Sequence, residues 1–234
     1  MKHAIRDWIA FWNSENSIYV NARHRDVHYA AIADALAMYV PHRDAIVLDY
    51  GCGEALHAER VAARCKELIL CEAAPAVRAQ VAARFRDHSK ITVRSPEEVL
   101  ALPDASLDCI AMVSVAQYLS PEMLDSLLRQ FRRLLRPQGM LVLGDIVPSG
   151  TSPLPDALAL LRFAAENGFV TAALGGLART AFSDYSKLRM SLGLSTYDAP
   201  AILAKLAAAG FAGERRPVNV GHNQRRMTFV GRPA

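Results

Sequence analysis

The chain has 234 residues, a formal net charge of +4 at pH 7 and 52% hydrophobic residues. This length and composition exclude an intrinsically disordered chain and fit one globular domain with a sizeable core. The basic residues are dispersed along the sequence, which favours solvated surface arginines over a continuous nucleic-acid-binding surface.

The N-terminal stretch MKHAIRDWIAFWNSEN contains acidic and amide side chains where a signal peptide would be apolar. The most apolar later stretch, residues 157–182, is interrupted by charged residues and falls short of the ~20 apolar residues that a membrane span needs. Four cysteines stand without a CxxC motif or a Cys/His cluster, so neither a disulfide framework nor a metal site is predicted. We therefore expect a cytoplasmic protein with reduced thiols and no membrane span.

A helical segment over residues 1–40 is the first predicted element. It places Trp8 and Trp12 close together and follows them with the polar and aromatic stretch SIYVNARHRDVHY (17–29). Such a segment could close over a bound ligand as a lid, or pack on the core as an ordinary amphipathic helix, and the sequence leaves both readings open. The main domain is expected to span residues 41–234.

Beyond the N-terminal segment, short apolar runs alternate with helical patterns, which predicts βαβ units and a doubly wound, mostly parallel sheet. The intervening helices show apolar residues at i, i+3, i+4 and i+7, most clearly between Leu124 and Leu135. Ser120 and Pro121 suit the N-cap and first position of that helix, and RPQG (136–139) is predicted to turn the chain into the fifth strand. The predicted strands are AIVLDY (45–50), LILCE (68–72), ITV (91–93), DCIAMVS (108–114) and MLVLGDI (140–146).

Two further regions follow the fifth strand. Residues 148–194 are predicted to hold two or three amphipathic helices, which could cap an apolar ligand pocket or merely enlarge the core. A helix ending at Gly210, a strand near 214–220, the turn GHNQRR (221–226) and the strand MTFVG (227–231) close the chain. The final strands predict a C-terminal antiparallel hairpin on the sheet edge, giving a seven-stranded, Rossmann-like α/β fold with helical cap elements.

The strongest functional signal is VLDYGCGEA (47–55), in which a hydrophobic strand runs into Asp, Gly-x-Gly and a helix. Glycines there permit backbone torsions and a close approach that a Cβ would block, so a nucleotide-like ligand can lie across the strand end. Glu72 ends the second strand nineteen residues beyond Gly53, where its carboxylate can accept hydrogen bonds from ribose hydroxyls. A dinucleotide fingerprint would have Gly or Ala at the position of Leu56, so NAD is the less favoured cofactor.

The sequence resembles class I S-adenosylmethionine-dependent methyltransferases, of the small-molecule type similar to the quinone-biosynthesis group, over residues ~45–146. The resemblance implies S-adenosylmethionine as cofactor, S-adenosylhomocysteine as product, and a methyltransferase domain over residues 41–234 with the 148–194 insertion. The motifs that carry it, specific only together, are VLDYGCGEA (47–55), LILCE (68–72), VRSPEEVLALPDASLDCI (93–110) and LLRPQGMLVLGDI (134–146).

The family pattern, carried over residue by residue, implies that the glycine loop surrounds the methionine part of the cofactor and that Glu72 holds its ribose. Adenine is expected near Ser95, where the family commonly has an acidic residue followed by one whose backbone N–H meets the ring. Pro96 lacks that N–H, so the Ser95 hydroxyl or the N–H of Glu97 is the expected substitute. The predicted cofactor-binding residues are Asp49, Gly51, Cys52, Gly53, Glu72, Ala73, Ser95, Pro96, Glu97, Val115 and Tyr118.

Acceptor and catalytic residues are predicted from topology, because ligands of open parallel sheets sit outside the carboxyl ends of the strands. The fourth strand ends in SVAQYL (114–119), and the GHNQRR turn should return to the cofactor rim if the sixth strand is parallel. Methyl transfer is an in-line displacement, so holding the acceptor in line supplies most of the rate and a general base is optional. Catalytic candidates are Tyr118, His222, Asp145 and His28, with His57 more often structural, and substrate-binding candidates are Tyr19, Asn21, Arg23, Gln117, Tyr185 and Asn223.

The favoured hypothesis is therefore a methyltransferase for a small-molecule acceptor that the sequence does not identify. An RNA or protein methyltransferase is an alternative, although the dispersed arginines and the lack of a visible RNA-binding module count against nucleic acid. A non-catalytic S-adenosylmethionine-binding protein is the second alternative, and an NAD-dependent oxidoreductase is the least favoured.

Overall fold

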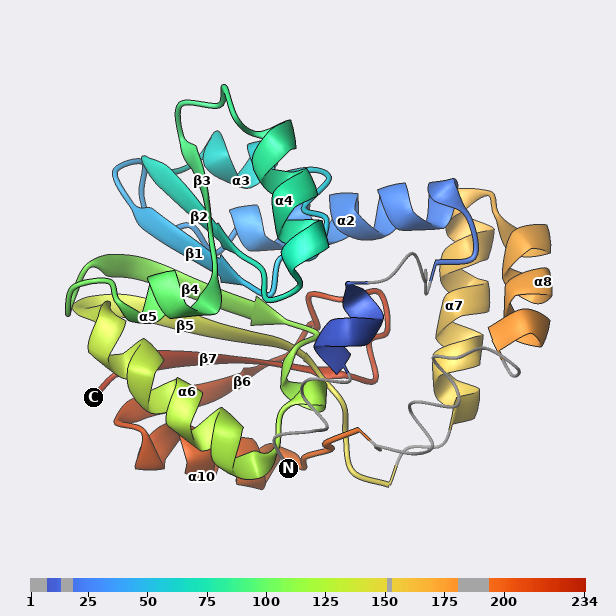
Figure 1. The fold of residues 1–234 in the computed structure, drawn as a ribbon. Helices are drawn as coiled ribbons and strands as arrows, with labels where there is room; N and C mark the ends of the chain where they lie inside the picture. The colour runs from blue at the N-terminus through green and yellow to red at the C-terminus, as the bar shows by residue number, and fades with distance from the viewer. Residues whose placement is uncertain (1–7, 14–18, 151–152, 181–193) are drawn as a thin grey trace.

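The computed structural model describes residues 8–13, 19–150, 153–180 and 194–234. Within these residues, seven strands form one sheet in the order β3-β2-β1-β4-β5-β7-β6 (Figure 1). β1 to β5 pair in parallel, and β7 lies antiparallel between β5 and β6. The predicted fold class, including the C-terminal antiparallel pair, is confirmed. The strands are β1 (Ile46–Tyr50), β2 (Glu67–Cys71), β3 (Ile91–Arg94), β4 (Leu107–Val113), β5 (Leu135–Ile146), β6 (Phe211–Arg216) and β7 (Met227–Pro233).

Helices cover both faces of the sheet, and one helix pair stands beyond the ends of the strands (Figure 1). That pair, α7 and α8, lies in the predicted 148–194 insertion, and α7 also contacts α2. Among the helices in the described ranges, none is long and apolar enough to cross a membrane. One face carries α2 (Ala22–Ala37), α3 (Ala58–Ala62) and α4 (Pro75–Arg84), the other carries α5 (Pro96–Leu100), α6 (Pro121–Leu134) and α10 (Ala199–Ala208), and the pair is α7 (Pro153–Asn167) and α8 (Val170–Thr180).

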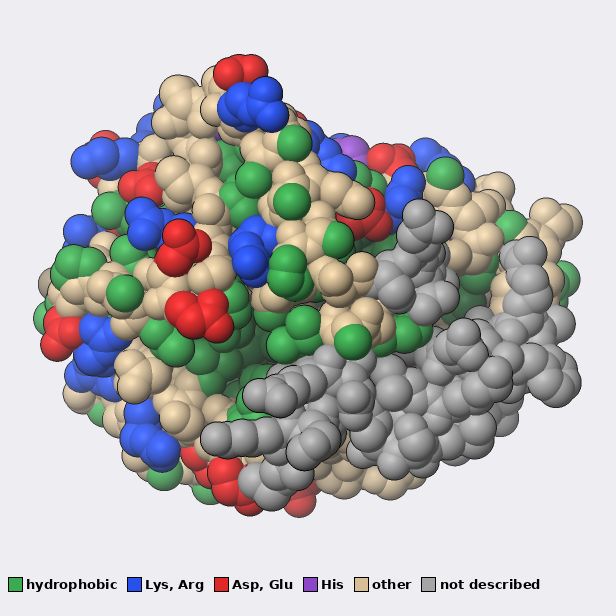
Figure 2. Space-filling view, viewed as in Figure 1, with side chains coloured by type: hydrophobic (Ala, Val, Ile, Leu, Met, Phe, Trp, Pro, Cys, Tyr) green, Lys and Arg blue, Asp and Glu red, His purple; other side chains and the backbone are tan. Residues whose placement is uncertain are grey.

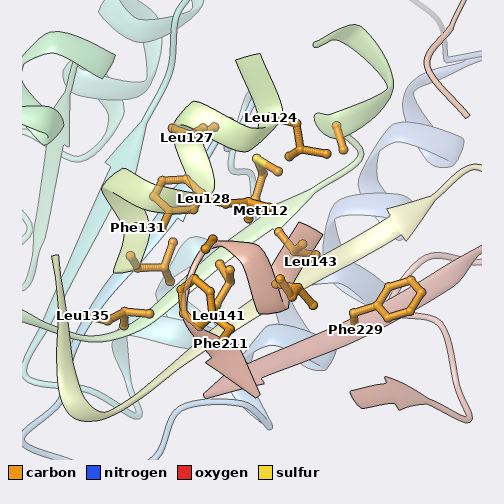
Figure 3. Close-up of a cluster of buried hydrophobic side chains, with 14 of the residues drawn as sticks. Met112, Leu124, Leu127, Leu128, Phe131, Leu135, Leu141, Leu143, Phe211 and Phe229 are labelled. Atoms are coloured by element: carbon orange, nitrogen blue, oxygen red, sulfur yellow. The ribbon is translucent and has the colours of Figure 1, made fainter. Parts of the chain in front are cut away.

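The helix α6 shows how the apolar pattern becomes core. The Ser120 hydroxyl accepts the N–H of Met123 and Pro121 takes the first turn, so the predicted start of this helix is confirmed. Its apolar side chains point at the sheet, toward Met112 of β4 and Leu141 of β5 (Figure 3). The buried stripe consists of Leu124, Leu127, Leu128, Phe131 and Leu134.

The start of β5 differs from the prediction. The strand already begins at Leu135, so RPQG (136–139) lies within it rather than forming a turn before it. The pairing of β4 with β5 jumps from Leu107–Leu135 to Cys109–Met140, so the extra residues of β5 leave the regular ladder as a bulge. Proline, glycine and polar residues in a bulge resemble a turn in the sequence, which explains the wrong prediction.

The sixth strand also lies earlier than predicted, over Phe211–Arg216 instead of 214–220. Gly210 has a left-handed φ of +84° just after α10, and the next side chain, Phe211, is buried at once in the core. The strand therefore begins at Phe211, directly after Gly210. Residues 217–226, the β6–β7 connection, carry the GHNQRR turn back to the edge of the sheet where the parallel strands end.

Candidate cofactor and acceptor site

A cavity of about 970 Å³ opens where the carboxyl ends of β1, β2, β4 and β5 meet. Residues 8–13 and α2 contribute to one part of its wall, and the β6–β7 connection contributes to another. The face of the molecule in Figure 2 shows a hollow lined by hydrophobic side chains. The cavity volume lies at the upper end of the ~300–1,000 Å³ range of ligand pockets, which leaves room for a nucleoside beside a second small molecule.

The glycine loop after β1 is constrained by both torsion and space. Gly51 and Gly53 have left-handed φ values of +80° and +56°, which favour glycine. A Cβ on Gly51 would lie 2.3 Å from Cγ2 of Val115, and a Cβ on Gly53 would lie 2.5 Å from the hydroxyl of Tyr29. That hydroxyl accepts the N–H of Glu54 at 2.9 Å. The glycines thus make room for side chains from α2 and from the segment that follows β4, which hold the loop in place.

Glu72 directly follows β2 and braces the glycine loop. Its Oε2 accepts the N–H of Gly53 at 3.0 Å, and its Oε1 accepts the N–H of Ala74 at 2.8 Å. Burial raises the pKa of Glu72, although these backbone hydrogen bonds partly offset the rise. A carboxylate offers about four lone-pair sites, so roughly two remain for the hydroxyls of a ribose.

Asp49 lies at the carboxyl end of β1, beside Glu72. Burial and the neighbouring charge of Glu72 raise the pKa of Asp49 to about 7. In the described part of the chain, no hydrogen bond or ion pair engages its carboxylate. A cation bound there would favour the ionised form, so this half of the cavity suits a positively charged group.

Pro96 and Glu97 lie on the cavity wall, whereas the side chain of Ser95 caps the N-terminus of α5. The Ser95 hydroxyl accepts the N–H of Glu98 at 3.3 Å, and the Glu98 carboxylate accepts the N–H of Ser95 at 2.6 Å, which makes a capping box. A hydrogen bond with the Ser95 hydroxyl also lowers the pKa of Glu97. Of the two expected substitutes for the missing adenine contact, Glu97 is the better placed.

The carboxyl ends of β4 and β5 meet at Ser114 and Asp145, which have left-handed φ values of +58° and +60°. Non-glycine residues rarely adopt this conformation outside functional or tightly packed sites. Asp145 accepts hydrogen bonds from the Ser114 hydroxyl at 2.7 Å and from Nδ2 of Asn219 at 2.9 Å. Burial alone would raise the pKa of Asp145, but the charge of Arg226 and these hydrogen bonds bring it below its usual value. Asp145 is an anchored anion with little capacity to accept a proton.

Arg226 neutralises two carboxylates on the acceptor side of the cavity, which is the part lined by Asp145, Asp156, His28 and His222. Its Nη1 donates to Asp145 at 2.6 Å, and its Nη2 donates to Asp156 of α7 at 3.3 Å. Nδ2 of Asn223 donates to the other oxygen of Asp156 at 2.6 Å. Burial opposes the charge of Arg226, yet the two carboxylates raise its pKa. These bonds tie β5, α7 and the β6–β7 connection together.

Neutral imidazole rings complete the acceptor side. His28 of α2 and His222 of the β6–β7 connection both line the cavity, with ring centroids 6.0 Å apart, and His24 lies 6.3 Å from each. Burial lowers the pKa of His24 and of His28 to about 4, and it lowers the pKa of His222 as well. The rings are therefore neutral at physiological pH. Phe163 stacks on His222 at 4.8 Å, and Tyr19 lies 5.4 Å from His28, between ring centroids.

Gln117 and Tyr118 follow β4 and also line the cavity. Nε2 of Gln117 donates to the carbonyl of Ser114 at 3.1 Å, but its buried Oε1 has no hydrogen-bond partner among the described residues. Leaving a buried acceptor unsatisfied is costly, so a donor on a bound ligand would stabilise it. Tyr118 packs on Trp8 with ring centroids 4.6 Å apart.

Not every predicted site residue reaches the cavity. Asn21 caps α2 by accepting the N–H of His24 at 2.8 Å, and the exposed Arg23 donates to the carbonyl of Asn167 at 3.3 Å. Tyr185 lies outside the described residues. The predicted residues on the wall are Asp49, Gly51, Cys52, Gly53, Glu72, Ala73, Pro96, Glu97, Val115, Tyr118, Tyr19, Gln117, Asn223, His28, Asp145 and His222.

Arg226 and Asp156 are among the polar wall residues that sequence reasoning missed. Arg226 reads as one more surface arginine, and Asp156 reads as a helix residue without a role. The signal for Arg226 is its position in the same turn as His222, which topology returns to the cofactor rim. No signal pairs it with Asp156, because the placement of α7 depends on tertiary packing. His57 pairs with Asp26 at 2.8 Å, in keeping with its structural interpretation.

A model of a methyltransferase domain family matches residues 48–143. The matched range runs from β1 to β5 and includes the glycine loop, Glu72 and the end of β4. This part of the chain is similar to a methyltransferase domain. A search among curated proteins finds no match.

Solved structures extend the methyltransferase fold beyond the matched range. DhpI, solved with S-adenosylhomocysteine, is 12% identical with a TM-score of 0.65, and the alignment covers 100% of this chain and 98% of DhpI. YcgJ from Bacillus subtilis is 17% identical with a TM-score of 0.57, over 80% of this chain and 70% of YcgJ. Human N-acetylserotonin methyltransferase, solved with S-adenosylmethionine, is 12% identical with a TM-score of 0.57, and the alignment covers 89% of this chain and 52% of that protein. At these identities the likeness establishes the fold.

Proposed function

We propose that this protein transfers a methyl group from S-adenosylmethionine to a small-molecule acceptor. The observation that carries the proposal is the joint placement of Asp49, Glu72 and two left-handed glycines on the wall of one cavity. These residues follow adjacent parallel strands at their carboxyl ends, where open α/β sheets bind their ligands.

The chemistry of the donor set fits this cofactor. S-adenosylmethionine carries positive charge on its ammonium and sulfonium groups, and the cofactor half of the cavity holds the half-buried carboxylates of Asp49 and Glu72. The remaining lone pairs of Glu72 suit two ribose hydroxyls, and the unsatisfied Oε1 of Gln117 suits an N–H or O–H donor. When bound, the cofactor supplies an electrophilic methyl group. The protein contributes by holding the methionine end, the ribose and the acceptor in line.

Two observations favour a small acceptor over RNA or protein. Residues 8–13 and α2 form part of the cavity wall, so the chain itself encloses the cofactor side. The described surface arginines also pair repeatedly with acids, which leaves a mixed surface instead of a continuous basic patch. These pairs include Arg25–Glu54, Arg60–Asp34, Arg133–Asp104 and Arg136–Asp108.

The finer sequence predictions belong to the same proposal. The lining of the cavity by α2 supports a lid role for residues 1–40, and the hydrogen bond that Arg226 donates to Asp156 supports a cap role for the 148–194 insertion. Four buried free cysteines support a reducing, cytoplasmic compartment. The relation to the quinone-biosynthesis group rests on the sequence motifs alone.

The deciding experiment is the melting temperature of the protein with S-adenosylmethionine, S-adenosylhomocysteine, NAD and NADP. We expect the two sulfur nucleosides to stabilise the protein and the nicotinamide cofactors to leave it unchanged. Glu72→Ala should reduce this stabilisation, whereas Glu67→Ala, at the opposite end of β2, should not. Stabilisation by NAD or NADP would contradict the proposal.

A non-catalytic cofactor-binding protein shares every feature of the cofactor half. Transfer of a radiolabelled methyl group from S-adenosylmethionine to a panel of small molecules separates the two functions. Turnover of any member supports the enzyme, whereas binding without turnover over a broad panel favours the non-catalytic alternative.

A further inference from the structure

Two histidine rings line the acceptor side of the cavity, and none of the described residues forms a hydrogen bond with their nitrogens. His28 and His222 approach from α2 and from the β6–β7 connection, with ring centroids 6.0 Å apart. Within the described ranges, no hydrogen bond engages either ring. By contrast, His24 accepts a backbone N–H and His57 pairs with Asp26. The nitrogens of His28 and His222 are therefore available to a ligand.

The cations around these rings are already neutralised. Arg226 contacts Asp145 at 2.6 Å and Asp156 at 3.3 Å, and the other arginine that the structure places on the wall, Arg25, contacts Glu54 at 3.3 Å. An anionic acceptor would meet the charge of Asp145 with no uncommitted cation among the described wall residues to hold it. The wall therefore suits an uncharged acceptor that donates a hydrogen bond to a histidine nitrogen.

The surroundings of His222 favour a proton on its ring more than those of His28. Phe163 stacks on His222 with an interplanar angle of 20°, which fixes the plane of the ring. Burial lowers the pKa of His222, the charges of Asp145 and Asp156 raise it, and the charge of Arg226 opposes them. A proton taken up here would be stabilised by two nearby carboxylates.

His28 sits among mostly uncharged groups. Its own segment supplies the rings of Tyr19, Tyr29 and His24, at 5.4, 5.6 and 6.3 Å between centroids. From the other elements it faces Asp145, which favours protonation, and Arg226 and His222, which oppose it. This environment suits a ring that stays neutral and holds a hydroxyl by a hydrogen bond.

Resting on the methyltransferase activity proposed above, we propose that the acceptor is an uncharged molecule with a mildly acidic hydroxyl, whose proton His222 accepts while His28 positions it. The acceptor oxygen forms a bond to the methyl carbon as the carbon–sulfur bond breaks, and that electron pair stays on sulfur. The hydroxyl proton moves to a ring nitrogen of His222 and is later released to solvent. A neutral imidazole removes the proton of an aromatic or enolic hydroxyl more readily than that of an aliphatic alcohol, because the aromatic or enolic hydroxyl is the stronger acid.

The first test measures binding to protein loaded with S-adenosylhomocysteine. Calorimetric titration compares 2-naphthol with 2-naphthoate, which share a ring system and differ in charge. We expect 2-naphthol to bind and 2-naphthoate to bind at least roughly tenfold more weakly. Failure of 2-naphthol to bind, or equal binding of 2-naphthoate, overturns the inference and leaves the proposed function intact. Failure to bind S-adenosylhomocysteine instead defeats the proposed function.

The second test measures proton transfer during methylation of 2-naphthol. His222→Gln should lower kcat by roughly 100-fold at neutral pH, with cofactor affinity within about twofold of the wild type. The deficit should shrink at alkaline pH, where 2-naphthol ionises without help, and added imidazole should restore part of the rate of His222→Ala. His28→Gln should raise KM more than it lowers kcat.

The matched control is His42→Gln, since His42 has a side chain 55% exposed and precedes β1 at the opposite edge of the sheet. It should leave rate and pH profile unchanged. Wild-type rates in His222→Gln, or a deficit that neither alkaline pH nor imidazole reduces, overturn the assignment of His222. Failure of the wild-type protein to methylate bound 2-naphthol overturns it as well.

Discussion

On the cofactor half of the cavity, Asp49 and Glu72 are half-buried without a salt bridge among the described residues, and their partial burial raises the pKa of both. On the acceptor half, Asp145 is more deeply buried, yet the charge of Arg226 and hydrogen bonds, including one from Ser114, hold its pKa down. Burial alone therefore does not decide the state of a carboxylate in this cavity. The protonation state is decided by the charges and hydrogen-bond donors that the protein holds beside the carboxylate. The first half is arranged to receive positive charge, and the second presents a wall whose charges are already balanced.

The helix α2 connects the two halves through consecutive residues. Tyr29 holds the glycine loop by accepting the N–H of Glu54, and His28 faces His222 on the acceptor side. Binding on one side can thus affect the position of α2 on the other. Substitutions that act on one half at a time test how far this comparison holds.

The largest effect is expected from Arg226→Ala, which leaves the buried Asp145 and the half-buried Asp156 without their shared cation. Removing one partner of a buried ion pair costs about 3–5 kcal/mol, so the melting temperature should fall by about 10 °C. The affinity for S-adenosylhomocysteine should change less than about threefold, because the cofactor half keeps its contacts. The control is Arg225→Ala, which changes the exposed neighbouring arginine. An unchanged melting temperature of Arg226→Ala would show that the acceptor wall does not depend on this cation.

A smaller effect, confined to the other half, is expected from Glu72→Gln. The amide keeps the shape of the side chain but loses the carboxylate that accepts the N–H of Gly53 and that, in the proposed complex, would accept the ribose hydroxyls. Hydrogen bonds to a charged group contribute about 2 kcal/mol, so the Kd for S-adenosylmethionine should rise roughly 30-fold. Glu67→Gln is the matched control in the same strand. Calorimetry giving equal Kd values for both variants would remove Glu72 from the cofactor site.

Asp49→Asn should change the pH dependence of the cofactor half. The pKa of Asp49 is raised from 3.8 to about 7, so the folded protein holds a proton that the unfolded chain has lost in this range. The associated stability is present below pH ~4 and is lost as the pH rises through ~7. At pH 8 the ligand-free variant should therefore melt higher than the wild type, while its affinity for S-adenosylmethionine falls roughly tenfold.

For the wild type, cofactor affinity should increase from pH 6 to pH 8 as Asp49 ionises, and Asp49→Asn should flatten that increase. Asp44→Asn, an exposed aspartate before β1, serves as the control. A wild-type pH profile retained in Asp49→Asn would assign the titration to another group.

The same comparison shows what the sequence could predict. The cofactor half is built from the glycine loop and Glu72, which end two consecutive strands paired in register along β1 and β2. Motif and topology together therefore place these groups. The same logic placed His222 at the rim, because a parallel sixth strand returns its following turn to the carboxyl edge.

The balance of charge on the acceptor half could not be predicted in this way. Arg226 and Asp156 are 70 residues apart and meet only because α7 packs beyond the strand ends. The commitment of Ser95 to a capping box and of Asn21 to the start of α2 likewise depends on local backbone geometry that residue type alone leaves open. Helix position and cap geometry carry the information that motifs lack.

The smallest effect is expected from Tyr29→Phe, which keeps the ring and removes the hydroxyl that accepts the N–H of Glu54 at 2.9 Å. An unsatisfied, partly buried N–H costs about 1 kcal/mol, so the protein should melt about 3 °C lower and bind S-adenosylmethionine roughly fivefold more weakly. Tyr29→Leu separates the hydroxyl from the ring, since it should cost more in stability. If Tyr29→Phe lowers acceptor affinity as much as cofactor affinity, α2 couples the two halves and they do not act separately.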